Sequence, residues 1–114
     1  MILTPETKNA MLRGVASMLN VGTRATLSIY IGEVLAVEIA MQNPVEFSVA
    51  GGILTFNTPP EALAIASGVP TAAKLRDSAG ALVAEFDVGT ELTLDKDKIY
   101  MGGYVGLNSL VISI

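Results

Sequence analysis

The sequence predicts a mainly β fold, an antiparallel β-sandwich or jelly-roll-like barrel with one N-terminal amphipathic α-helix. Apolar residues recur every three or four positions in the first 20 residues, and after residue 24 they alternate with polar ones, which is the period of a strand. Glycine and proline turn signals separate these alternating runs. At 114 residues the chain suits a single core. We expect one domain, with residues 1–22 as a helical docking or capping element and residues 23–114 as the sandwich.

A helix is predicted over residues 5–19. Thr4 is a good N-cap, Pro5 suits the first helical position, and Asn20 with Gly22 provides a stop. A helix of about four turns is marginal alone, so its apolar stripe must pack on this chain's own sheet or on a neighbouring subunit. The candidate interface consists of the residues of this stripe, Met11, Leu12, Val15, Met18 and Leu19.

Alternation predicts a series of short strands in the rest of the chain, and the stretch 61–67 is read as strand or loop because its alanines also favour a helix. The clearest hairpin has a turn that starts at Asp77 and ends at Gly80. In its second strand we expect Leu82 on the same face as the other even-numbered residues, and Val83 on the opposite face. The predicted strands are 25–31, 35–39, 45–49, 53–56, 71–76, 81–87, 91–95 and 110–114.

The composition argues against catalysis, because the chain has no histidine, cysteine or tryptophan. Histidine- and cysteine-dependent nucleophiles, their metal sites and the commonest general base are thereby excluded. Carboxylate chemistry remains, and its candidates are Glu85 with Asp87 on one strand face, and Asp95 with Asp97. We interpret both pairs as solvated, the second because lysines alternate with its aspartates. We therefore expect no enzyme activity, no cofactor and no metal.

Two further features have a functional and a structural interpretation. The glycine-rich segment 102–106 lacks the Lys-Ser/Thr and the following helix of a phosphate loop, so we read it as a turn before the last strand. The tyrosines Tyr30, Tyr100 and Tyr104 could line a sugar-binding surface. Without tryptophan, we favour buried rings whose hydroxyl groups reach a partner.

The surface is expected to contact other proteins. The chain is 51% hydrophobic and only 16% charged, against about 25% in average domains, and its mean hydropathy is +0.55. Residues 99–114 are too short and polar to span a membrane, and charges at Glu6, Lys8 and Arg13 do not fit a signal peptide. With a net charge of −4 and scattered basic residues, nucleic acid is not an expected partner.

Several segments occur in an order that resembles small β-sandwich accessory virion proteins of tailed bacteriophages, of the capsid decoration type. The order begins with an Asn-containing, Leu/Ala-rich helix and ends with an alternating closing strand. No single motif is specific, and the resemblance lies in their succession over most of the chain. The segments are NAMLRGVASMLN (9–20), ATLSIYIG (25–32), AGG (50–52), AKLRDSAG (73–80), VG (88–89), LTL (92–94) and SLVISI (109–114).

The resemblance implies a non-enzymatic decoration, or cement, protein that binds the phage head surface as a homo-oligomer, with a trimer favoured. Its partners would be the major capsid protein or other virion proteins, and it would be made in the host cytoplasm and reside in the virion. Two alternatives stay open: a head–tail, tail or fibre component that binds a receptor or glycan, and a carboxylate-only hydrolase.

Overall fold

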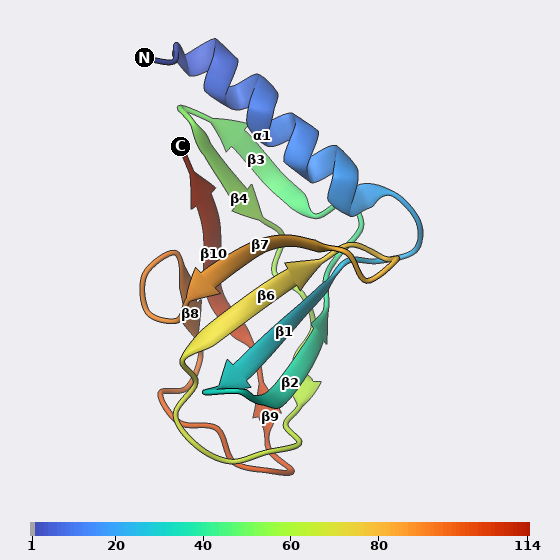
Figure 1. Ribbon diagram of the computed structural model, residues 1–114, viewed down its shortest axis with the longest axis vertical. Helices are drawn as coiled ribbons and strands as arrows, with labels where there is room; N and C mark the ends of the chain where they lie inside the picture. Colours follow the sequence, from blue (N-terminus) through green and yellow to red (C-terminus); the bar gives the residue numbers. More distant parts are fainter. Residues whose placement is uncertain (1) are drawn as a thin grey trace.

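The computed structural model describes residues 2–114, which form one N-terminal helix followed by strands (Figure 1). The prediction of a mainly β chain with a helix at its N-terminus is confirmed. The helix is predicted within one residue of its observed bounds. The elements are α1 (Pro5–Asn20), β1 (Thr26–Ile31), β2 (Val34–Ala40), β3 (Glu46–Ala50), β4 (Ile53–Phe56), β5 (Ala62–Leu63), β6 (Ala72–Arg76), β7 (Leu82–Asp87), β8 (Leu92–Leu94), β9 (Tyr104–Val105) and β10 (Leu107–Ser113).

The strands form two four-stranded sheets and one small pair. The first sheet has the order β2-β1-β6-β7, the second β3-β4-β10-β8, and β5 pairs with β9. Every named pairing of these strands is antiparallel. Both larger sheets begin and end with an edge strand, so no closed barrel forms among the described residues.

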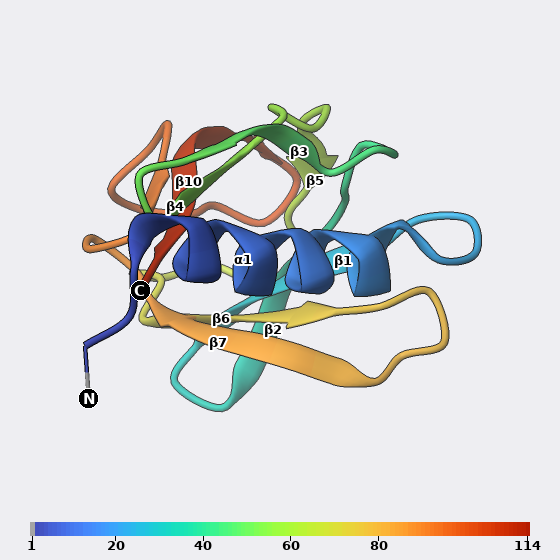
Figure 2. The same ribbon diagram turned by 90° about the horizontal axis from the view of Figure 1, so that it is seen from above.

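Helix α1 lies along the opening between the two sheets (Figure 2). The side chain of Thr4 caps it by accepting a hydrogen bond from the Thr7 N–H at 3.2 Å. Its contacts are with β3 and β4, and its residues Leu12, Ala16 and Leu19 are buried. These three side chains belong to the same hydrophobic core as the inward-facing residues of both sheets. The helix therefore covers apolar surface of its own chain.

The C-terminal end of the helix is tied to the start of β3 through Asn20. The side chain of Asn20 accepts a hydrogen bond from the Val45 N–H at 2.8 Å and donates one to Glu46 at 2.8 Å. Val45 is fully buried, so water cannot easily replace the asparagine as a partner for this N–H. This contact sets the position of the helix relative to the second sheet.

Replacing Asn20 with alanine is expected to lower the free energy of unfolding by about 1–3 kcal/mol, because the buried Val45 N–H loses its acceptor. Chemical denaturation followed by circular dichroism measures this effect. Asn43→Ala is the matched control, because the Asn43 side chain also contacts the end of the helix. It does so only through longer hydrogen bonds of 3.1–3.5 Å, to the carbonyls of Asn20, Gly22 and Thr23. Equal losses in the two variants would contradict a special role for Asn20.

Gly52 joins three elements at the turn between β3 and β4. Its N–H donates to the Asn9 side chain of the helix at 2.9 Å, and its carbonyl accepts from the Ile114 N–H at 3.1 Å. Its φ of 76° is a conformation that other residues rarely adopt, and a Cβ there would lie 3.1 Å from the Ile114 carbonyl oxygen. A glycine is therefore required where the helix, the hairpin and the last strand meet.

The strand predictions are confirmed for most of the chain, with two differences. Strand β9 and the first residues of β10 are not among the predicted strands. In β7 the expected alternation is confirmed from Ala84 to Asp87 but is wrong at the start of the strand: a register shift between Leu75 and Arg76 leaves Leu82 48% exposed, while Val83 packs partly against the core. A bulge of this kind moves a side chain to the other face of a strand.

Candidate interaction surface

The predicted helical stripe is divided between the core and the surface. Leu12 and Leu19 are 1% and 0% exposed, so the expectation that they form a docking surface is wrong. They already pack inside their own chain, because the helix covers the opening between the sheets. Val15 is partly buried against the same core. Only Met11 and Met18 are half exposed, and an interface role for these two remains a prediction.

A larger exposed apolar surface lies at one end of the molecule, around β5, β9 and the loops that follow β5 and precede β9. We call its six residues the tip surface. Each is more than half exposed, from 52% for Leu63 to 68% for Met101. The long axis of the molecule measures 43 Å, and Figure 1 shows these loops at the end opposite the helix. The tip surface consists of Leu63, Ile65, Val69, Tyr100, Met101 and Tyr104.

Hydrogen bonds hold the two segments of the tip surface side by side. Strand residues Leu63 and Tyr104 are register partners, so their side chains point to the same face. The pairing continues past the strands, since the Ala64 N–H donates to the Gly103 carbonyl at 2.9 Å. The Met101 N–H donates to the Ser67 hydroxyl at 2.8 Å. The apolar side chains are therefore presented by a fixed backbone.

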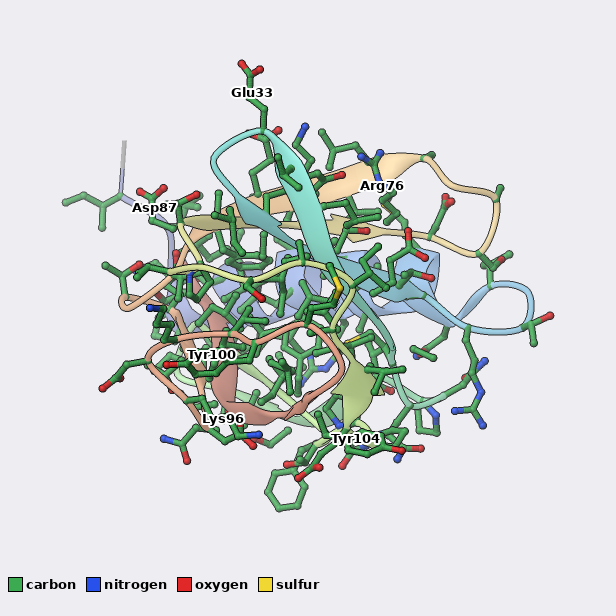
Figure 3. All side chains as sticks on the ribbon, turned by 90° about the horizontal axis from the view of Figure 1, so that it is seen from below. Glu33, Arg76, Asp87, Lys96, Tyr100 and Tyr104 are labelled. Atoms are coloured by element: carbon green, nitrogen blue, oxygen red, sulfur yellow. The ribbon has the colours of Figure 1, made fainter. Side chains whose placement is uncertain are left out.

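The tyrosines of the tip do not match the sequence-based expectation of buried rings. Tyr100 is 61% exposed and Tyr104 is 58% exposed, whereas Tyr30 is partly buried. In the view from below, Tyr100 and Tyr104 lie on the same side of the molecule as Lys96, away from Glu33 (Figure 3). Two rings of this exposure present on the order of 200 Å² of surface.

Charged groups at the tip make contacts within the chain. The Lys96 ammonium donates to the Tyr104 carbonyl, and the Lys98 ammonium lies 5.4 Å from the centre of the Tyr100 ring. The Asp95 carboxylate accepts a hydrogen bond from the Gly106 N–H at 3.1 Å. Asp95 therefore fixes the loop before β10.

The second pair of candidate carboxylates lies on the first sheet. Glu85 and Asp87 are both exposed on β7, and Glu85 is the register partner of Lys74. Both carboxylates therefore lie on the polar face of the strand, with Lys74 beside Glu85. Nothing in this arrangement distinguishes the pair from a polar strand face.

Residues 2–114 contain neither a cluster of metal-ligating side chains nor a membrane-spanning helix. No three acidic side chains of this part of the chain come close enough together to hold a metal ion. Every buried side-chain nitrogen or oxygen that the structure describes has a hydrogen-bond partner. The helix among these residues is not of the length and hydropathy needed to cross a bilayer.

Sequence reasoning missed the tip surface because its residues lie in short segments without a long period. Leu63 and Ile65 fall in the stretch whose structure was ambiguous, and Met101 lies beside glycines. A usable signal was the occurrence of large apolar residues next to turn-forming glycine, where no core strand can continue.

Comparison of the chain with models of protein families, with curated proteins and with solved structures gives no match.

Proposed function

We propose that this chain is a non-enzymatic structural protein of a phage particle, a capsid decoration protein that binds the head surface as a homo-oligomer. The two four-stranded sheets would act as an open β-sandwich whose helix closes one side. The observation that carries the proposal is the tip surface, because six large apolar side chains are gathered there on a backbone held by hydrogen bonds.

The size of the tip surface supports a contact with protein. Together the six side chains present on the order of 600 Å². The largest apolar patch of a typical monomer is roughly 300–600 Å², and a standard interface buries about 800 Å² on each partner. With a rim of polar residues, the tip surface is large enough for such an interface.

The arrangement of the molecule also suits a particle surface. The tip surface lies at one end of the long axis, and helix α1 lies toward the other end (Figure 1). Met11 and Met18 of this helix are half exposed. Two separated contact regions allow one protein to bind its own copies and a shell at the same time. Repeated contacts of moderate area become strong through multivalency.

The test of the decoration role is the copy number in particles. Quantitative mass spectrometry of purified virions that encode this chain should find it at a fixed ratio of order one to the major capsid protein. A few copies per particle would instead indicate a tail or fibre protein. Absence from purified particles would contradict any virion role.

A glycan-binding tail or fibre component is the second candidate, and the exposure of Tyr100 and Tyr104 favours it. Aromatic rings that face solvent can stack on sugar rings, whereas buried ones cannot. Binding to a glycan array that is lost in a Tyr100→Ala, Tyr104→Ala double variant would support this role. An array without binding would remove it.

A further inference from the structure

We propose that the second sheet carries a binding site for a neutral sugar residue, in a groove on its outer side. The groove has a volume of about 450 Å³, within the range of roughly 300–1,000 Å³ that small-ligand sites occupy. It shares no residue with the tip surface. A sugar bound there would not depend on the proposed virion role, because the tip surface takes no part in holding it.

The groove lies on the side of the second sheet that faces away from the core. Thr55 of β4 and Val111 of β10 are register partners, and both line the groove. The neighbours of Thr55 in β4, Leu54 and Phe56, are buried in the core. Because successive side chains of a strand point to opposite faces, Thr55 and Val111 point outward. Figure 1 shows β3, β4 and β10 side by side, as the strand order requires.

Two register shifts of the second sheet each add one residue at the groove. The pairing of β3 with β4 shifts at Phe47, and the pairing of β10 with β8 shifts at Asn108. Both of these extra residues line the groove. A β-bulge re-aims a side chain, and bulges are frequent next to functional sites. Two bulges that bring an aromatic ring and an amide to one groove therefore indicate a ligand site.

The aromatic ring provides the apolar part of the site. Phe47 is 73% exposed, so a ligand that covers its ring removes apolar surface from water. Phe56, Leu107 and Leu110 also line the groove, and each is less than 10% exposed. A sugar ring carries C–H groups on one face, which can stack on an aromatic ring, and hydroxyl groups around its rim.

Amide and hydroxyl side chains provide the polar part. Asn108 is exposed, and its amide can donate two hydrogen bonds and accept others, as neighbouring sugar hydroxyls require. The Asn57 amide donates to the carbonyls of Pro44 and Glu46 at 3.1 and 3.0 Å, which leaves its own oxygen as an acceptor. The hydroxyl of Thr58 lines the same groove. These groups match the hydroxyl rim of a sugar.

The backbone of the groove is already paired, so recognition must come from side chains. The Val111 N–H donates to the Glu91 carbonyl on the β8 side, and its neighbour Leu110 therefore directs its backbone groups toward β4. With Val111 opposite Thr55, Leu110 bonds to Phe56. An extended peptide would find no open strand edge here. None of the lining residues is charged, which favours a neutral sugar over one with a carboxylate or phosphate.

The test is an NMR titration of the isotope-labelled protein with the methyl glycosides of glucose, galactose, mannose and N-acetylglucosamine. At least one should bind with a dissociation constant of roughly millimolar order and shift the signals of Phe47 and of the Asn108 side-chain amide. No shift at these residues with any of the sugars at about 50 mM would overturn the site. Shifts confined to Tyr100 and Tyr104 would also overturn it, and would assign sugar binding to the tip surface.

Three further ligands define the chemistry. Cyclohexanol keeps a six-membered ring but lacks most hydroxyls, and should bind at least about tenfold more weakly because the amides lose their partners. Equal binding of cyclohexanol would show an apolar hollow and overturn the sugar site. The methyl glycoside of glucuronic acid should bind no more tightly than the best neutral sugar. Preferential binding in the groove of a blocked peptide of alternating proline and threonine would assign it to a protein partner and overturn the proposal.

Matched variants locate the sugar. Phe47→Ala and Asn108→Ala should each weaken binding about tenfold, through the lost ring face and the lost hydrogen bonds. Phe47→Tyr keeps the ring and should retain binding. Tyr100→Ala removes a ring of similar exposure at the tip and should leave binding unchanged. All three side chains are exposed, so the melting temperature should stay the same. Full binding by Phe47→Ala, or loss of binding in Tyr100→Ala, would contradict the site.

Discussion

Replacing Leu19 with alanine is expected to lower the free energy of unfolding by about 2–5 kcal/mol. Leu19 is fully buried in the core that the helix shares with the sheets, so its removal leaves a cavity as well as losing apolar contact. Domains of this kind are stable by only about 5–15 kcal/mol, so the loss would be visible as a large shift in a urea transition.

Met18→Ala is the control for this prediction, because it changes the neighbouring residue of the same helix. Met18 is 55% exposed, and its replacement should change the free energy of unfolding by no more than about 0.5 kcal/mol. If both variants lost equally little, the helix would not be part of the core. Its whole stripe would then be available to a partner, as the sequence alone allowed.

Replacing Leu63 and Met101 together with glutamate is expected to weaken self-association at least about 100-fold. In an interface through the tip surface, these carboxylates would lose water without gaining a partner, at a cost of about 3 kcal/mol or more. Both side chains are more than half exposed, so the fold should keep its melting temperature. Sedimentation equilibrium over a range of protein concentrations gives the dissociation constant.

Met11→Glu makes the same kind of change at the other exposed surface. Met11 is 50% exposed on the helix, in a position where glutamate preserves helix propensity. We expect it to leave self-association unchanged. If Met11→Glu dissociated the oligomer and the tip variant did not, the helix would be the contact between copies and the tip surface would be left for the shell.

Local signals explain what could be predicted from the sequence. The helix start at Thr4 and Pro5 depends on bonds between near neighbours, and the turn from Asp77 to Gly80 closes on itself: the Asp77 side chain accepts hydrogen bonds from the Ala79 and Ala81 N–H groups at 3.0 and 2.9 Å. Strands with regular alternation were predicted for the same reason. These features need little knowledge of the rest of the molecule.

The remaining features depend on contacts between distant segments. Strand β9 exists because Tyr104 and Val105 pair with β5, some 40 residues earlier in the chain, and nothing local marks it. The split of the helical stripe follows from which side of α1 meets β3 and β4. The exposure of Tyr100 follows from its position in a turn at the end of the molecule. The spacing of apolar residues along the sequence does not indicate contacts between such distant segments.

The structure also shows where a chain with so few charged residues exposes apolar side chains. The sequence indicated that part of the surface contacts protein, and its candidate was the helix. Leu12 and Leu19 are now accounted for inside the core, and the tip surface takes their place as the main exposed apolar region. Our proposal of an interface protein therefore rests on the tip surface and not on the helix.

We propose that this chain works by packing against copies of itself and other proteins. Its most direct test is the mass of the purified protein in solution, measured by light scattering during size-exclusion chromatography across concentrations. We expect an oligomer, with a mass near three times 11.9 kDa for the favoured trimer. A single species of 11.9 kDa at every concentration up to the millimolar range would contradict it.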